Sequence, residues 1–516
     1  MLYCIRRFSP SWLADFWTGG EMCVFLPEML VSVAKICYHV LNAKRPERSG
    51  REKPCGKQNE EEKAMRENSN AARPTIGTEG VYDARALGLP KMLVLGLQHT
   101  FAMFGATVLV PFLTGLSVPT TLLCAGAGTL LFHLITKGKV PAFLGSSFAF
   151  LGGILMVAPK LVDPATGEAT VANTEMLPYA CGGIVVAGLV YVVMSLLISV
   201  FGIQKVMRFF PPVVTGPIII SIGLILAPSA IQNCQSNWLL AIVALGIVVA
   251  CNIWGKGMVK ILPILLGIVG AYLVALCLGE VDFTAVQEAQ VIAFPVVRSQ
   301  MAKFSLSAIL TIVPISLATM MEHIGDVAAI SATTGKNFIR DPGLNRTLLG
   351  DGLATTLAGF LGGPANTTYG ENTGVLALSR VYDPTVVRIA ACFAILLSFS
   401  PKFGALVSTV PAGIIGGISF ILYGMISAIG VRNVVENQVD FTNSRNLIIA
   451  AVILVSALGF NSIGGLTIVV NPELTINLSG VAISAILGIL LNAVLPGNDY
   501  EFDRVNNTGD SMNFEI

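Results

Sequence analysis

Carboxylates that stand in apolar surroundings are the residues of this sequence best suited to chemistry. Two of them, Glu322 and Asp326, are four residues apart in the stretch Met321-Glu-His-Ile-Gly-Asp326, and this spacing puts both on one face of a helix. Two carboxylates that close in a low dielectric do not both stay ionised, so one of them should hold a proton near neutrality. The pattern predicts a group that takes up and releases a proton. The alternative for Asp326 is a solvated position at the helix end.

A third carboxylate, Glu371, lies in a stretch too polar and too rich in glycine and proline to form an ordinary spanning helix. This stretch, Leu361–Arg380, is flanked by long apolar runs. We expect an extended piece over Pro364–Tyr369 and then a half-length helix that begins near Glu371. Non-helical backbone persists at membrane depth only where protein buries it or water reaches it, which is typical of a binding site. The alternative for Glu371 is a simple cap of the half-helix.

A second broken run contains Pro141-Ala-Phe-Leu-Gly-Ser-Ser-Phe148 and matches the pattern of Pro364-Ala-Asn-Thr-Thr-Tyr-Gly-Glu371. Both open with Pro-Ala, turn polar and continue as a short apolar helix. We expect backbone N–H donors at the two half-helix starts, Phe148 and Gly370, and the two extended pieces could pair as strands at the midplane. Backbone donors beside carboxylate acceptors fit a small, neutral, flat ligand with alternating N–H and C=O groups, such as a nucleobase. An anion fits less well, because a carboxylate would repel it.

Four more polar residues stand in apolar runs. Asp351 begins such a run, either as a helix-start cap or as a membrane-buried partner. Gln98 and His99 form a polar pair in an uncharged run, and we expect them to bond to backbone or to each other; a role in shaping the site is the alternative. On a helix, His323 points about 100° away from Glu322, and it is either a hydrogen-bonded core histidine or a functional one.

The composition is that of a polytopic membrane protein. Of the 516 residues, 54% are apolar and 12% are charged, and the mean hydropathy is +0.74. The net charge of +1 gives no basis for nucleic-acid binding. The cysteines show no metal-ligand spacing and are interpreted as small hydrophobes. Since no nucleophile–base or metal constellation is present either, we expect neither an enzyme nor a bound cofactor or metal.

We predict an all-α membrane protein with fourteen transmembrane segments, most of them near the ~20 residues that a spanning helix needs. The third and tenth are the broken strand–half-helix segments; being seven apart, they imply two inverted repeats of seven. With a cytoplasmic N-terminus, Lys and Arg concentrate in the inside loops, as the positive-inside rule requires. The runs are Met92–Leu116, Val118–Thr136, Pro141–Pro159, Leu177–Phe201, Val213–Ile231, Trp238–Trp254, Ile261–Leu278, Phe304–Ile324, Thr347–Leu361, Pro364–Leu378, Thr385–Ser400, Val410–Val431, Leu447–Ile463 and Leu478–Leu495.

The two ends of the chain differ from this pattern. Residues 1–85 form an N-terminal extension without a cleavable signal peptide, which we expect to be disordered or an artefact of gene calling. Its Ala43–Glu67 stretch is dense in Lys, Arg and Glu, a composition typical of disorder. Met65 is a candidate for the true translation start; a peptide of the purified protein that begins before Met65 would refute this hypothesis. Residues 498–516 are expected to form a cytoplasmic tail.

On its motifs, the sequence resembles the nucleobase:cation symporter-2 family, also called the nucleobase–ascorbate transporters, and within it the bacterial uracil permeases. The match runs from about Lys91 to about Leu495. The motifs that carry it are Gln98-His-Thr-Phe-Ala-Met-Phe-Gly-Ala106, Gly138-Lys-Val-Pro-Ala-Phe-Leu-Gly-Ser-Ser-Phe-Ala-Phe150, Glu322-His-Ile-Gly-Asp326 and Asn366-Thr-Thr-Tyr-Gly-Glu-Asn-Thr-Gly374.

The resemblance implies two domains, each built from two parts of the chain. A substrate-carrying core would comprise residues 91–201 and 304–405, and a gate would comprise 203–279 and 409–497. The gate would also form a homodimer. The protein would lie in a bacterial cytoplasmic membrane, in contact with lipid, as a multi-pass protein with both termini in the cytoplasm.

The resemblance also implies proton-coupled import of uracil by an elevator-like movement of the core, with H⁺ as the coupling ion. The base would be held by Glu322, Glu371, Phe148 and Gly370. Site support or proton coupling would come from Asp326, Asp351, His99, Gln98 and Asn372.

Two features of the sequence keep alternatives open. Asp326 stands where the best-known uracil permease has a histidine that takes part in proton coupling, which leaves the pH dependence open. Asp351 matches a carboxylate more typical of the purine-transporting branch, whereas Glu371 stands where xanthine and urate carriers usually have Gln, which favours uracil. The alternatives are a xanthine or urate permease of this family and, from another class, an anion exchanger of related fold.

Overall fold

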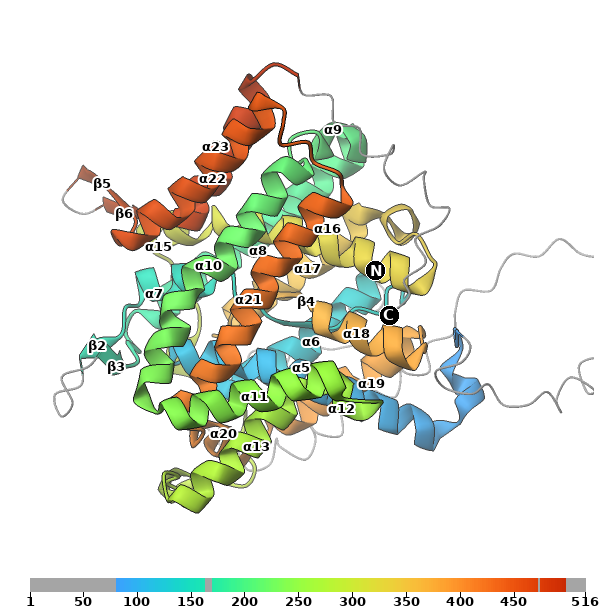
Figure 1. Cartoon of the computed structure of the whole chain (residues 1–516), viewed down its shortest axis with the longest axis vertical. Helices are drawn as coiled ribbons and strands as arrows, with labels where there is room; N and C mark the ends of the chain where they lie inside the picture. Colours follow the sequence, from blue (N-terminus) through green and yellow to red (C-terminus); the bar gives the residue numbers. More distant parts are fainter. Residues whose placement is uncertain (1–79, 163–168, 472–473, 498–516) are drawn as a thin grey trace, which may run out of the picture. The chain divides into compact units, whose positions relative to one another are not determined.

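The computed structural model describes residues 80–162, 169–471 and 474–497 (Figure 1). Most of the predicted N-terminal extension, with Met65, and the predicted tail 498–516 lie outside these residues. The last part of that extension does not fit the expectation of disorder. Gly80–Leu87 is structured, with a β-bridge at Val81 and a 3₁₀ helix, η2 (Ala84–Leu87).

The described residues contain seven helices that are long and apolar enough to cross a membrane. They are α5 (Leu89–Thr114), α6 (Val118–Ile135), α8 (Leu177–Phe201), α10 (Pro212–Ser236), α15 with α16 (Leu306–Ile312 and Ile315–Thr334), α21 (Ala412–Glu436) and α22 (Ser444–Ser462). An eighth candidate, α19 (Pro384–Ser398) with α20 (Pro401–Ser408), is bent by 88°. A multi-pass helical membrane protein is confirmed, while the number fourteen and the inverted repeat stay predictions.

Shorter elements complete the described chain. The apolar ones are α11 (Trp238–Trp254), α13 (Pro263–Leu278) and α23 (Gly480–Val494), while α17 (Leu344–Phe360) is more polar. The smaller ones are α9 (Ile203–Met207), α12 (Met258–Ile261), α14 (Thr284–Glu288), η3 (Arg298–Gln300) and the π-helical η4 (Ile339–Gly343). Two antiparallel hairpins, which the sequence did not reveal, are β2 (Leu161–Val162) with β3 (Ala169–Val171) and β5 (Leu466–Asn471) with β6 (Leu474–Leu478).

Helices from distant parts of the sequence pack closely because glycines let their backbones approach. A Cβ added to Gly188 on α8 would lie 2.6 Å from the Gly352 carbonyl oxygen on α17. Likewise, a Cβ on Gly223 of α10 would lie 2.2 Å from the Tyr423 carbonyl oxygen on α21, and α10 and α21 run side by side in Figure 1. Such close contacts through small residues are the usual way in which helices associate inside a membrane.

The two broken segments form the predicted strand pair. Strand β1 (Leu144–Ser146) pairs antiparallel with β4 (Asn366–Thr368), with Gly145 opposite Thr367. The half-helices α7 (Leu151–Val157) and α18 (Gly370–Ser379) follow. The expected start at Gly370 is confirmed, but α7 begins three residues later than the expected Phe148.

The reason for the late start of α7 is a turn. The Leu151 N–H donates to the Phe148 carbonyl at 3.0 Å, and the regular helical bonds begin only afterwards. In the second segment Gly370 follows the strand with one residue between, and helical bonding starts at once.

Candidate functional site

The β1–β4 pair lies in the interior and fixes both half-helices. All six strand residues are buried. Beyond the strands, the Ser147 N–H donates to the Ala365 carbonyl at 2.8 Å. On the other side, the Tyr369 N–H donates to the Phe143 carbonyl at 3.0 Å. The place where the two broken segments meet at the β1–β4 pair is called the crossing below. Since the first N–H groups of a helix have no acceptor within it, the start of α18 at Gly370 presents backbone donors at this crossing.

Tyr369 ties the two segments to helix α5. Its hydroxyl donates to the Ser146 carbonyl at 2.8 Å and lies 3.1 Å from the Ser146 hydroxyl oxygen. The Thr107 hydroxyl of α5 donates to the same tyrosine oxygen at 3.4 Å. The start of α18 is therefore held through a side chain that sequence reasoning did not select.

Helix α16 brings its carboxylates to this crossing. Glu322 and Asp326 are both partly buried and lie one turn apart. The Thr368 hydroxyl donates to Asp326 Oδ2 at 2.8 Å, and a Cβ on Gly370 would lie 3.7 Å from Asp326 Oδ1. Because α16 continues to Thr334, the interpretation of Asp326 as a solvated helix end is wrong. Asp326 lies beside the start of α18.

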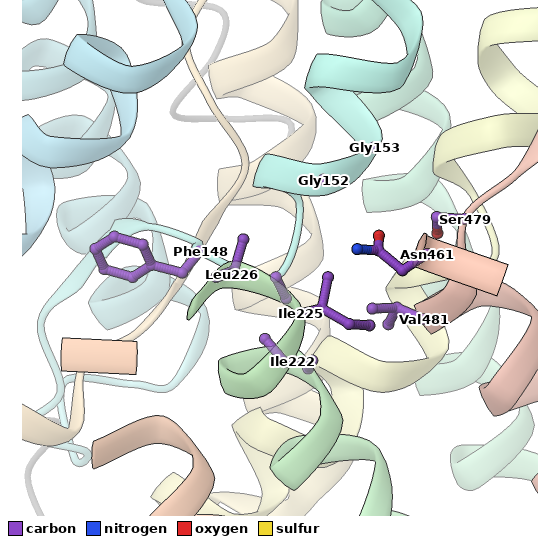
Figure 2. A pocket seen from close by; sticks show the side chains of 10 residues that line it. Phe148, Gly152, Gly153, Ile222, Ile225, Leu226, Asn461, Ser479 and Val481 are labelled. Carbon is purple, nitrogen blue, oxygen red and sulfur yellow. The ribbon is translucent and has the colours of Figure 1, made fainter. Parts of the chain in front are cut away.

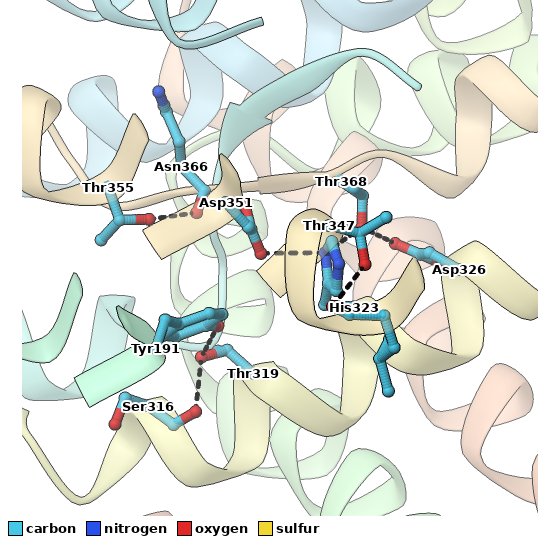
Figure 3. A network of polar contacts seen from close by, with 11 residues as sticks. Tyr191, Ser316, Thr319, His323, Asp326, Thr347, Asp351, Thr355, Asn366 and Thr368 are labelled. Atoms are coloured by element: carbon cyan, nitrogen blue, oxygen red, sulfur yellow. Dashed lines mark hydrogen bonds and ion pairs between the residues drawn. The ribbon is translucent and has the colours of Figure 1, made fainter. Parts of the chain in front are cut away.

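A buried histidine–aspartate contact stands behind Asp326 (Figure 3). His323 Nδ1 lies 3.0 Å from Asp351 Oδ2, and both side chains are fully buried. The contact is an ion pair when the imidazole is protonated. The Thr368 hydroxyl lies 3.5 Å from the same nitrogen. Thr368 thus stands between Asp326 and His323.

This contact decides between the readings of Asp351. It is the eighth residue of α17 and fully buried, so the helix-start cap is wrong and the buried partner is right. Sequence reasoning left open whether His323 is a core or a functional histidine, because it considered only that His323 points away from Glu322. The structure shows that His323 contacts Asp351. The sequence did offer a hint: His323 and Asp351 each stand in an apolar run, and a buried polar side chain needs a polar partner.

The polar pair of α5 reaches the first turn of α18. Asn372 Nδ2 lies 3.1 Å from His99 Nδ1 and donates to the His99 carbonyl at 3.2 Å. His99 accepts from Asn372 in the tautomer with its proton on Nε2. The expectation that the His99 side chain bonds to backbone or to Gln98 is therefore wrong, since its partner is an amide on the half-helix. Gln98 is buried on the same helix.

The first broken segment faces a different neighbour. The Phe148 ring packs edge-on against Tyr423 of α21, with ring centroids 6.0 Å apart. Beside Phe148 lies a small hollow, part of it open to solvent. Figure 2 shows its lining from α7 (Gly152, Gly153), from α10 (Ile222, Ile225, Leu226) and from Asn461, Ser479 and Val481. This side of the crossing is mainly apolar.

The structure thus gathers Phe148, Gly370, Asp326, Asp351, His99 and Asn372 around the β1–β4 pair, with Glu322 one turn from Asp326. Glu371 belongs to the first turn of α18, but its side chain lies outside what the structure describes. Sequence reasoning missed Thr368, Tyr369 and Tyr423. Within the described ranges, no group of three or more His, Cys, Asp or Glu residues could hold a metal ion.

Known proteins resemble this chain over most of its length. The model of the Permease family, Xan_ur_permease, matches residues 90–463. The uracil permease of Bacillus subtilis is 42% identical over 417 residues, which cover 78% of this chain and 91% of that protein. The uracil permease of Bacillus caldolyticus is 40% identical over 438 residues, covering 82% of this chain and 94% of that protein.

A solved structure shares the fold. The transmembrane domain of BicA, a cyanobacterial bicarbonate transporter, superposes with a TM-score of 0.54 at 14% identity. The superposition covers 80% of this chain and 99% of that domain. At this identity the likeness concerns the fold alone.

Proposed function

The chain belongs to the nucleobase:cation symporter-2 family of permeases, and from this premise we propose that it imports uracil together with protons. Two relatives, 40% and 42% identical, are uracil permeases. Membership of a permease family makes it a multi-pass membrane transporter and not an enzyme.

The observation that carries the uracil proposal is the meeting of helix starts and carboxylates at the β1–β4 pair. Backbone N–H groups near Phe148 and Gly370 would donate to the base carbonyls. Glu322, together with Glu371, would accept from the base N–H groups. The backbone donors of the protein match the carbonyl groups of the base, and the carboxylates of the protein match its N–H groups. This arrangement selects a neutral ring with alternating N–H and C=O groups, because an unmatched buried polar group costs about 1–3 kcal/mol.

Proton coupling would use the polar chain behind the base. Asp326, Thr368, His323 and Asp351 follow one another at 2.8, 3.5 and 3.0 Å. A proton taken up by this group neutralises one carboxylate. Moving an uncompensated charge past apolar side chains costs several kcal/mol, so the protonated, loaded site should cross more readily than the empty, deprotonated one.

The packing of the helices supports an elevator-like movement. In the proposed core (91–201 and 304–405), α8 packs on α17 and α6 packs on both α17 and α19. In the proposed gate (203–279 and 409–497), α10 packs on α21 and α22 packs on α23. The contact between Phe148 and Tyr423 is one of those that join the two sets, and we propose that the core slides past the gate along these contacts.

We further propose a homodimer formed through the gate in a bacterial cytoplasmic membrane, with both termini in the cytoplasm. The exposed face of α22 fits a lipid or subunit contact, because its Leu447, Ile448 and Val455 are 55%, 50% and 71% exposed. A contiguous exposed apolar face of this kind marks a lipid or protein contact.

Uptake of radiolabelled uracil by proteoliposomes tests the proposal. An acidic outer solution should raise the initial rate above that at equal pH, and unlabelled uracil should compete better than xanthine. Liposomes without protein give the background, and Glu436→Gln, which alters only an exposed ion pair with Arg432, is the matched variant. Stronger competition by xanthine would point to a purine permease. Transport that ignores the pH gradient and follows bicarbonate would point to an anion exchanger.

A further inference from the structure

A short segment ahead of the first spanning helix attaches to the region where the site-bearing helices end. We name this segment, Gly80–Leu87, the N-terminal strap. Its Val81 forms a parallel β-bridge with Val381. The Val81 N–H donates to the Arg380 carbonyl at 2.7 Å, and the Tyr382 N–H donates to the Val81 carbonyl at 2.8 Å. The strap therefore adds one strand residue to the linker between α18 and α19.

A second attachment follows three residues later. The Ala84 N–H donates to Asp383 Oδ2 at 2.9 Å, while Asp383 Oδ1 accepts from the Thr385 N–H and caps α19. The side chains of Val81, Ala84 and Leu87 are buried, with exposures of 4%, 0% and 2%. The strap is thus held by hydrogen bonds and by apolar contact.

Tyr82 reaches from the strap to α16. Its hydroxyl donates to the carbonyl of Thr334, the last residue of that helix, at 2.8 Å. Its ring lies 5.3 Å from the ring of Tyr382, and Lys336 Nζ lies 4.3 Å from its centroid, a cation–π distance. One side chain thus contacts both the end of α16 and the linker that follows α18.

These two helices carry the candidate site. Asp326 of α16 and Thr368, just ahead of α18, join them at the site. The strap joins them again at their far ends, about 12 Å further along α16 at 1.5 Å per residue. Helix α18 has only ten residues and packs against α16 and α5, so a contact at its far end adds directly to what sets its angle to α16.

We propose that Tyr82 is a positioning residue: through the strap it fixes the spacing of α16 and α18 and with it the fit of the transported base. The transport part of this inference rests on the proposed function. The spacing part does not depend on which substrate is carried.

The spacing is measured with spin labels on Ala329→Cys of α16 and Leu378→Cys of α18, both exposed positions, after replacement of the ten native cysteines. With Tyr82→Phe, the distance distribution between the labels should broaden or shift. The matched control is Tyr179→Phe, because this tyrosine also has a lysine, Lys303, near its ring, at 6.0 Å. An unchanged distribution in folded Tyr82→Phe overturns the proposal, whatever the protein transports.

Uracil uptake supplies the second measurement. In Tyr82→Phe the KM should rise about 3- to 10-fold, the effect of one lost hydrogen bond of about 0.7–1.4 kcal/mol, while the maximal rate per folded protein holds. A merely structural strap would instead lower the folded yield and leave KM at the value of Tyr179→Phe, and that result overturns the proposal. If Tyr82→Phe does not fold, Lys336→Gln must raise KM in the same direction, or the inference fails. Absence of uptake by the unaltered protein counts against the proposed function only, because the label distances still decide the role of Tyr82.

Discussion

The two broken segments share a backbone plan but differ in chemistry. Each has a three-residue strand followed by a short helix, and the strands pair with each other. The first continues with Leu151-Gly-Gly and lies against the apolar side chains of α10 and α21. The second opens its helix with Gly370-Glu-Asn-Thr and bonds to α16 and α5.

We infer from this difference that the two segments contribute differently to transport. Both segments offer backbone donors, which any polar ligand could use. Among the described residues, the second segment has Asp326, His323 and Asp351 close behind Thr368, whereas the first has a histidine, His133, at the Ala142 carbonyl ahead of its strand. Substitutions in the second segment should therefore change substrate choice and proton dependence, while those in the first should change fit and rate.

The largest effect is expected from Glu371→Gln, which removes the carboxylate of the second segment. Uracil uptake should fall roughly 10- to 150-fold, because a hydrogen bond to a charged group contributes about 1.5–3 kcal/mol, and preference should move toward purines. Initial rates in proteoliposomes measure both. Uptake of uracil equal to that of the Glu436→Gln control would contradict the assignment.

The next largest effect is expected from Asp351→Asn, which should lower the stability of the protein. The variant leaves buried His323 without its carboxylate, and the free energy of unfolding should drop by about 2 kcal/mol. Thermal unfolding in detergent, followed by tryptophan fluorescence, reports it. Because the two side chains are in contact, the double variant with His323→Gln should lose less than the sum of the single losses. Additive losses would show that the pair is not coupled.

The strand pair itself is probed by Gly145→Ala. A Cβ there would lie 2.5 Å from the Tyr369 ring and 2.8 Å from Thr107 Oγ1, so the rigid ring must shift, at about 1–3 kcal/mol. Uracil affinity should weaken about 10-fold. Gly152→Ala is the matched control, because its added Cβ meets nothing within 4 Å. If both variants bind uracil equally well, Tyr369 does not set the site.

The smallest effect belongs to Phe148→Leu in the first segment. It removes an edge-on aromatic contact with Tyr423, worth about 0.5–1.5 kcal/mol, so uptake should slow about 2- to 10-fold. The dependence of uptake on the pH gradient should stay unchanged, since the neighbours of Phe148 in the hollow are mainly apolar. An altered pH profile would remove the contrast between the segments.

The sequence predicted the backbone of the site better than its side-chain contacts. Pro-Ala at 141 and 364, followed by polar residues inside apolar runs, was enough to locate both strands and the start at Gly370. These features depend on local sequence. Burial of Asp351 could not be deduced in the same way, because it depends on how α17 is rotated against α16.

Contacts between distant residues explain the other errors. His323 and Asp351 are on different helices, and Asn372 meets His99 across 273 residues of sequence. We expected the strap to be disordered together with the rest of the N-terminal extension, because that expectation rested on the charged stretch Ala43–Glu67. Its partners, Arg380 and Thr334, lie about 250–300 residues away, and no local pattern points to them.

The pairing of Leu144 with Thr368 also constrains how the protein is made. The two residues are 224 positions apart (368 minus 144), so β1 is synthesised long before its partner strand exists. Helix α7, with seven residues, is about 10 Å long and cannot cross the roughly 30 Å of hydrocarbon by itself. Unpaired backbone is costly in lipid. The first half of the chain therefore has to hold β1 and α7 away from lipid, in an unfinished state, until β4 and α18 have been made.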